Sequence, residues 1–182
     1  FGNYSAREFT GTVNVPLSDK IAIRAAGRIT RRSALVDNVA GPDVDTQHRQ
    51  AGRLSLLIQP TDSIENYTIG DIYTSSEYMP GVAGILQTVA NCPQSFVACI
   101  YDGIGKPLSA AVAEQDALGK DAVALPRVGK STLRVWGVAN HTTIDLGGLT
   151  IKNILSYRKV RQHIRSDNDG FRYALFESVQ PE

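Results

Sequence analysis

The sequence has few of the residues on which small disulfide-rich or metal-binding proteins depend. It contains 2 cysteines, 1 tryptophan and 1 methionine in 182 residues. Two cysteines allow one disulfide, and no further metal ligands stand close to them. The chain also has no large excess of charge of one sign, because 19 Lys and Arg are balanced by 18 Asp and Glu, for a net charge of +1. The basic residues are spread along the chain, so we predict no nucleic-acid partner.

Long hydrophobic runs are absent as well. No apolar run approaches the roughly 18 residues of a helical membrane span. A transmembrane strand shows no such run, because its outward residues alternate with inward ones. No signal peptide opens the chain, which begins at Phe1 within a strand-like pattern and stops at Glu182. We therefore expect an internal piece of a longer protein.

No motif predicts catalysis, a cofactor or a metal. Val128–Thr132 imitates the end of a phosphate-binding loop, but Ala124 stands where that motif needs its first glycine. Asp167–Gly170 is similar to a calcium loop, but Arg165 occupies the first ligand position, so a solvated turn is expected. The histidines lie far apart without ligand spacing, at His48, His141 and His163. We predict that the chain is not an enzyme, and we expect no cofactor.

Alternation of apolar and polar residues is the strongest pattern present. Between Arg7 and Arg32 it runs along two arms that meet at the turn Pro16–Asp19. The alternate positions are apolar or small: Phe9, Gly11, Val13, Val15, Leu17, Ile21, Ile23, Ala25, Gly27 and Ile29. A period of two predicts a β-hairpin. Each arm exceeds the usual five or six residues and reaches the roughly 9 to 11 that cross a bilayer at a tilt.

The same pattern predicts further strands, about six in all. They are expected at Gly52–Gln59, Ile64–Ser75, Lys130–Leu146 and Leu149–Arg165. The face of the strand at 64–75 stays open, because Ile69, Asp71 and Tyr73 share one side. The fold class is therefore all-β, an antiparallel meander.

The connections differ in length in a regular way. Short turns at Pro16–Asp19, Pro60–Ser63 and Asp145–Gly148 alternate with long segments at Ser33–Gln47 and Tyr78–Gly129. The second long segment is predicted to hold one short helix, 108–118, which stops at glycine 119. Short turns on one side and long loops on the other are typical of outer-membrane barrels. A soluble β-barrel or β-sandwich that binds a small ligand is the alternative, and a continuous apolar belt edged by aromatics would distinguish the two.

Three stretches carry a family resemblance: Gly2–Arg7, Val13–Asp19 and Ala22–Gly27. They resemble the first barrel strands of TonB-dependent outer-membrane receptors of Gram-negative bacteria, and the likeness continues through the last strand pair. At the turn 60–63 the family commonly has a Trp-x-Pro-Thr-Asp-type sequence, and here Gln59 precedes the proline, which is a departure from that pattern. The resemblance implies that residues 1–182 form part of a 22-stranded transmembrane β-barrel in the cell outer membrane.

The resemblance also implies partners and a task. The full-length chain would carry a plug domain and a TonB box, neither of which this sequence contains. Expected partners are outer-membrane lipid, that plug domain, the inner-membrane TonB complex and a scarce solute. The solute is most often a ferric siderophore in this family, with sugars, cobalamin or plant aromatics as alternatives. No ligand-binding residue of the family is transferred to a position here.

Two sets of residues are candidates for function. In an oxidising compartment Cys92 and Cys99 are predicted to form a disulfide within the long loop at about 78–129. Basic residues on the polar strand faces are predicted to line the barrel lumen, as salt-bridge partners or ligand contacts: Arg24, Arg28, Arg53, Lys152 and Arg158. Apolar residues are predicted to share one outward, convex face: Phe9, Val13, Ile21, Ile23, Leu54, Leu56, Leu149, Ile151 and Leu155.

Overall fold

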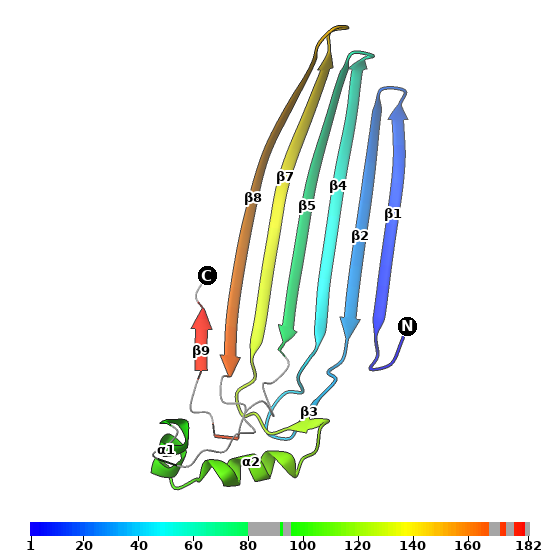
Figure 1. The fold of residues 1–182 in the computed structure, drawn as a ribbon. Coiled ribbons are helices and arrows are strands. Elements are labelled where there is room, and N and C mark those ends of the chain that lie inside the picture. Colours follow the sequence, from blue (N-terminus) through cyan, green and yellow to red (C-terminus); the bar gives the residue numbers. More distant parts are fainter. Residues whose placement is uncertain (80–91, 93–95, 168–171, 174–176, 181–182) are drawn as a thin grey trace.

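One long antiparallel sheet dominates the computed structural model of the chain (Figure 1). The structure describes residues 1–79, 92, 96–167, 172–173 and 177–180. The sheet has the order β1-β2-β4-β5-β7-β8-β9. Its strands are β1 (Arg7–Ser18), β2 (Ile21–Arg32), β4 (Gln47–Thr61), β5 (Ile64–Tyr78), β7 (Lys130–Asp145), β8 (Thr150–Asp167) and β9 (Glu177–Gln180).

The predicted meander is confirmed, because each of the six long strands pairs with its neighbour in sequence. The strand predicted at 52–59 is longer than expected: β4 begins at Gln47, which pairs with Arg32 of β2. Likewise β5 continues to Tyr78, which pairs with Lys130 of β7. Cross-strand pairing therefore extends both strands beyond the alternation that their own residues show.

The register gives the sheet two different faces, since directly opposed residues point to the same side. The row Val13, Ala25, Leu54 lies on one side, which we call the apolar face. The predicted outward residues all share this side by alternation, and six of them are exposed: Phe9, Val13, Leu54, Leu149, Ile151 and Leu155. Opposite it lies the polar face, which contains Ile69, Asp71 and Tyr73 and so settles the facing of β5.

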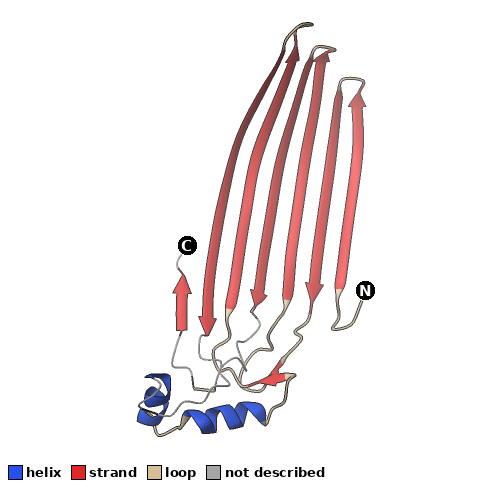
Figure 2. Cartoon of the chain, in the orientation of Figure 1, coloured by secondary structure: helices blue, strands red, loops and turns tan. Residues whose placement is uncertain are grey.

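The described parts of the two long connections form a small body at one end of the sheet, which we call the cap (Figure 2). It contains the helices α1 (Phe96–Gly103) and α2 (Leu108–Asp116), and β3 (Asp37–Asn38) pairs in parallel with β6 (Ala122–Val123). The predicted helix is therefore present. After it Gly119 adopts a φ of 78°, as expected for a glycine stop. The sequence analysis missed α1, β3, β6 and β9.

The hydrophobic core lies in the cap and not in the sheet. One cluster joins α1 to α2 through Ala98, Tyr101, Leu108 and Ala111. A second cluster joins the two loops through Val44, Val123, Leu125 and Val128. Among the described residues, no apolar side chain of the long strands is fully buried. The sheet therefore leaves its apolar face uncovered within the described parts of the chain.

The helices of the cap are short, with 8 residues in α1 and 9 in α2. In the described parts of the chain, no helix has both the length and the apolar character needed to cross a membrane.

Candidate functional site: the polar face of the sheet

All five basic residues predicted to line a lumen lie on the polar face. The register aligns Arg53 of β4 with Asp71 of β5, and Asp71 in turn with Gly137 of β7 and Arg158 of β8. By alternation along the strands, the same face includes Arg24 and Arg28 of β2 and Lys152 of β8. The sequence pattern thus placed these cations on one side of the sheet correctly, while their relation to a lumen is a prediction.

Arg158 and Asp71 form an ion pair that spans β7. One guanidinium nitrogen of Arg158 donates to both carboxylate oxygens of Asp71, at 2.9 and 3.2 Å. Gly137 lies between them in the register, so no side chain blocks the reach of Arg158. A Cβ at position 137 would lie 2.8 Å from the carbonyl oxygen of Tyr157 and 3.5 Å from the Cβ of Arg158. The glycine is therefore required for this close crossing.

Other cations of the polar face are also paired. Arg28 donates to Glu8 across β1 and β2 at 2.8 Å. Arg49 binds Glu77 through two nitrogens, at 2.6 and 3.2 Å. The acidic partners were not identified from the sequence, because the strand register decides which carboxylate meets which cation.

Three of the predicted cations have no such partner. In the described parts of the chain, Arg24, Arg53 and Lys152 form no ion pair and are exposed. Arg53 stands opposite Asp71 in register, but the carboxylate of Asp71 binds Arg158 instead. These side chains are free to meet an anionic solute or acidic groups of another protein segment.

The polar face is hollowed near the cap. An open hollow of about 370 Å³ lies between β1, β2, β4 and β5 and is lined by Glu8, Arg28, Arg49 and Tyr73, among others. Both members of the Arg28–Glu8 pair contribute to its wall, together with Arg49 of the Arg49–Glu77 pair. The hollow is open and its mixed lining carries both positive and negative side chains, so it can take a hydrated group.

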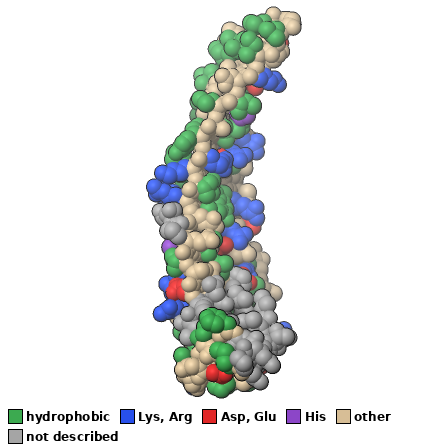
Figure 3. Space-filling view, turned by 60° about the vertical axis from the view of Figure 1, so that its left-hand side comes forward, with side chains coloured by type: hydrophobic (Ala, Val, Ile, Leu, Met, Phe, Trp, Pro, Cys, Tyr) green, Lys and Arg blue, Asp and Glu red, His purple; other side chains and the backbone are tan. Residues whose placement is uncertain are grey.

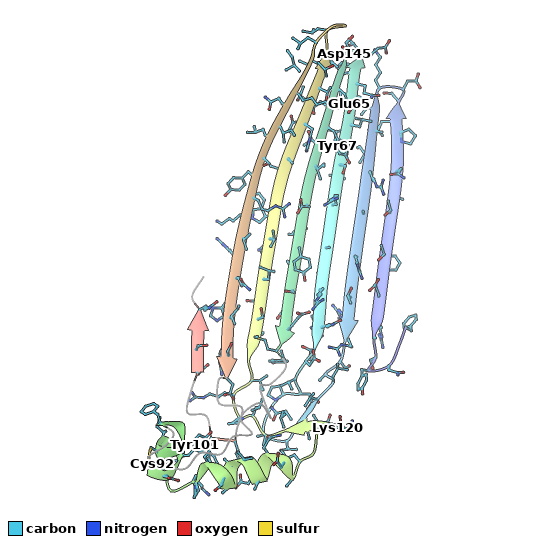
Figure 4. The ribbon with its side chains drawn as sticks, in the orientation of Figure 1. Glu65, Tyr67, Cys92, Tyr101, Lys120 and Asp145 are labelled. Atoms are coloured by element: carbon cyan, nitrogen blue, oxygen red, sulfur yellow. A yellow bond between two sulfur atoms is a disulfide. The ribbon has the colours of Figure 1, made fainter. Side chains whose placement is uncertain are left out.

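Cys92 and Cys99 form a disulfide in the structure, with their Cα atoms 4.7 Å apart. The predicted bond is thus present. Cys99 belongs to α1, and Figure 4 shows Cys92 in the cap near Tyr101, far from Glu65 at the short-turn end of the sheet. Residues 93–95 and most of the preceding loop lie outside the described residues.

The histidines do not converge. By alternation His48 and His163 lie on the apolar face and His141 on the polar face. The described residues contain no group of three or more metal-ligating side chains. Of the predicted solvated turn, residues 168–170 lie outside the described residues, while Asp167 is buried at the end of β8.

The apolar face is not apolar throughout. Near the short-turn ends of β5 and β7, Asn66, Thr68, Asn140 and Thr142 form a hydrogen-bonded group on it. The two asparagine amides bind each other in both directions, at 3.1 and 2.9 Å. The belt is therefore interrupted here, although these side chains largely satisfy one another.

Comparison with known proteins adds no relative: no family model, no curated protein and no solved structure matches this chain.

Proposed function

We propose that this chain is part of the wall of a transmembrane β-barrel in the cell outer membrane. The observation that carries the proposal is the uncovered apolar face. Phe9, Leu54 and Leu155 are 69, 58 and 73% exposed on one side of a sheet whose long strands, as far as they are described, contain no fully buried apolar side chain. Lipid would cover this face, and closure into a barrel would pair both sheet edges.

Strand length supports the same proposal. The six long strands have 12 to 18 residues, whereas about 9 to 11 suffice to cross a bilayer at a tilt. The short turns at one end and the folded cap at the other match the periplasmic and external sides of such barrels. On this proposal the polar face is the lumen wall.

We further propose that the barrel belongs to a TonB-dependent receptor that imports a scarce solute, most often a ferric siderophore in that family. The support is the resemblance of the early strands together with the free cations of the polar face. Arg24, Arg53 and Lys152 provide positive charge that would attract an anionic solute or dock acidic groups of a plug domain.

One observation favours a second candidate, the soluble β-barrel or β-sandwich, in which other protein segments would cover the apolar face. The Asn66–Thr142 group places amides and hydroxyls where lipid would lie. Polar groups of this kind are common under a packed protein layer. Their mutual hydrogen bonds reduce the cost of contact with lipid as well, so this group does not outweigh the exposed apolar face.

Paired cysteine labelling tests the membrane proposal. Arg53→Cys and Leu54→Cys are neighbours on opposite faces, and the native cysteines are oxidised. In lipid vesicles, a bimane label at 54 should be quenched by a doxyl lipid, and a label at 53 by aqueous iodide. Equal access of iodide to both positions would contradict the proposal.

Transport is tested separately: cells without the gene should lose uptake of radioactive ferric siderophore, and a protonophore should have the same effect on wild-type cells.

A further inference from the structure

Unpaired cations also lie on the apolar face, where no lumen would explain them. Arg134 of β7 stands directly opposite Arg161 of β8, and Lys159 follows two residues before Arg161 on the same side. We call these three residues the basic cluster. Together with Trp136 they line one open hollow of about 250 Å³. Like charges placed directly opposite on a sheet destabilise it, so an anion bound here would relieve the repulsion.

The described parts of the chain do not supply such an anion. In its described parts, no member of the basic cluster forms an ion pair or a side-chain hydrogen bond. The nearby carboxylate of Glu177 is engaged with Arg127 and Arg165. Arg134, Lys159 and Arg161 are all exposed. The described carboxylates thus leave the positive charge of the basic cluster without a partner.

The residues next to the cluster indicate an amphiphile. Trp136 and Tyr157 contact each other with ring centroids 5.5 Å apart, on the side of the cluster that faces the short turns. Beyond them Val138 and Leu155 are 44 and 73% exposed, next to the hydrogen-bonded group that contains Asn140. Aromatic rings between an apolar band and charged groups mark the head-group level of membrane proteins.

The positions of these residues along the strands agree with the order of charged head group, aromatic rings and lipid chains. The cluster lies on the cap side of the aromatic pair. In Figure 3, hydrophobic patches lie among other side chains at the short-turn end of the molecule, and most Lys and Arg side chains lie further toward the cap. From Ile144 to Trp136, at roughly 3.4 Å per residue, the strand spans more than the apolar part of one leaflet, and this span includes the hydrogen-bonded Asn140 and Thr142.

We propose that the basic cluster binds the phosphate head group of an anionic membrane lipid, with the lipid chains lying along Val138 and Leu155. The guanidinium groups of Arg134 and Arg161 would bind phosphate oxygens bidentately, and Lys159 would add a point charge. This inference rests on the proposed membrane location and adds a ligand class to the outer surface of the wall.

Quenching of Trp136 tests the proposal, because it is the chain's single tryptophan and adjoins the cluster. The full chain in neutral detergent is titrated with brominated phosphatidylglycerol or brominated phosphatidylcholine. We expect half-maximal quenching by the anionic lipid at a mole fraction on the order of tenfold lower than by the zwitterionic lipid. The triple variant Arg134→Gln/Lys159→Gln/Arg161→Gln should abolish this preference and keep quenching by both lipids.

The matched control removes the same charge from the opposite face, as Arg24→Gln/Arg53→Gln/Lys152→Gln, and should keep the full preference. Equal quenching by both lipids in the wild type, or equal loss in the control, would overturn lipid binding at the cluster. Displacement by millimolar inorganic phosphate would overturn it in favour of a free anion. Absence of quenching by either lipid, with an intact β-sheet circular dichroism spectrum, would instead contradict the proposed membrane location.

Discussion

The side-chain amide of Asn38 donates a hydrogen bond to the carbonyl of Leu125 and accepts one from its backbone N–H, both at 2.8 Å. The two residues are 87 positions apart in the chain. Asn38 is buried, and its amide also donates to the carbonyl of Pro42 at 3.0 Å. One amide thus fastens the shorter loop of the cap to the longer one.

Substitution of Asn38 by Asp should open the cap locally. A carboxylate accepts but does not donate, so the carbonyls of Leu125 and Pro42 lose their partner in a buried place. We expect a loss of about 1 to 3 kcal/mol, measured as faster hydrogen exchange at Leu125. The exposed neighbour provides the control, because Asp37→Ala should change exchange little. Unchanged protection in Asn38→Asp would show that the two loops are held together by other contacts.

Substitution of Gly41 by Ala should disturb the same junction by steric overlap. A Cβ there would lie 2.9 Å from the carbonyl oxygen of Leu125 and 3.0 Å from the amide nitrogen of Asn38. Neither the backbone nor a fixed amide moves away cheaply, so we expect about 1 to 3 kcal/mol of destabilisation in thermal unfolding. Gly103→Ala meets no atom within 4 Å and should be close to neutral. A stable Gly41→Ala variant would contradict the close packing of the loops.

The sequence predicted the sheet much better than the cap. The alternation of apolar and polar residues in the hairpin at 7–32 can be read from neighbouring residues alone. Together with a short turn, this alternation fixes how the two strands pair. Partners such as Asp71 for Arg158 depend on the register of three strands and on Gly137 between them. The junction of Asn38 with Leu125 depends on contacts between distant loops, for which no local pattern exists. Helix α1 was missed because its 8 residues are mostly apolar and lack both acidic residues in the first turn and basic residues in the last.

Substitution of Gly137 by Ala should weaken the pairing of β7 with β8. The added methyl group would lie 2.8 Å from the carbonyl of Tyr157 and would crowd Arg158, which crosses to Asp71 at this point. We expect a loss of about 1 to 3 kcal/mol, measured by denaturant unfolding in detergent. Gly70→Ala, in β5, meets nothing within 4 Å and is the matched control. If both variants were equally stable, Gly137 would have no steric role.

The disulfide should protect the cap and leave the sheet unaffected. It closes a loop with a sequence separation of 7, which stabilises by about 2 to 3 kcal/mol in the chain-entropy model. Under denaturing, non-reducing conditions no thiol should react with a maleimide reagent. The double variant Cys92→Ser/Cys99→Ser should be cleaved sooner by protease within the cap, with the β-sheet signal in circular dichroism unchanged. Reactive thiols in the oxidised protein would refute the bond.

The bare chain in water should aggregate or form oligomers. The outer edge of β1 pairs with no described strand, and β8 is covered by β9 only from Ile164 to Asp167. Both edges therefore present N–H and C=O groups that can add another chain.

The apolar face acts in the same direction, since Phe9, Leu54 and Leu155 are among many large side chains that it exposes. Soluble monomers rarely expose more than a few hundred Å² of contiguous apolar surface. Size-exclusion chromatography with light scattering measures the outcome: without detergent we expect species well above 19.7 kDa, and in detergent micelles a single defined protein mass. The chain with Leu54→Glu and Leu155→Glu should aggregate less in water, because these charges interrupt the apolar face. A sharp monomeric peak of the unmodified chain near 19.7 kDa, with cooperative thermal unfolding, would refute the outer-membrane proposal and favour the soluble alternative.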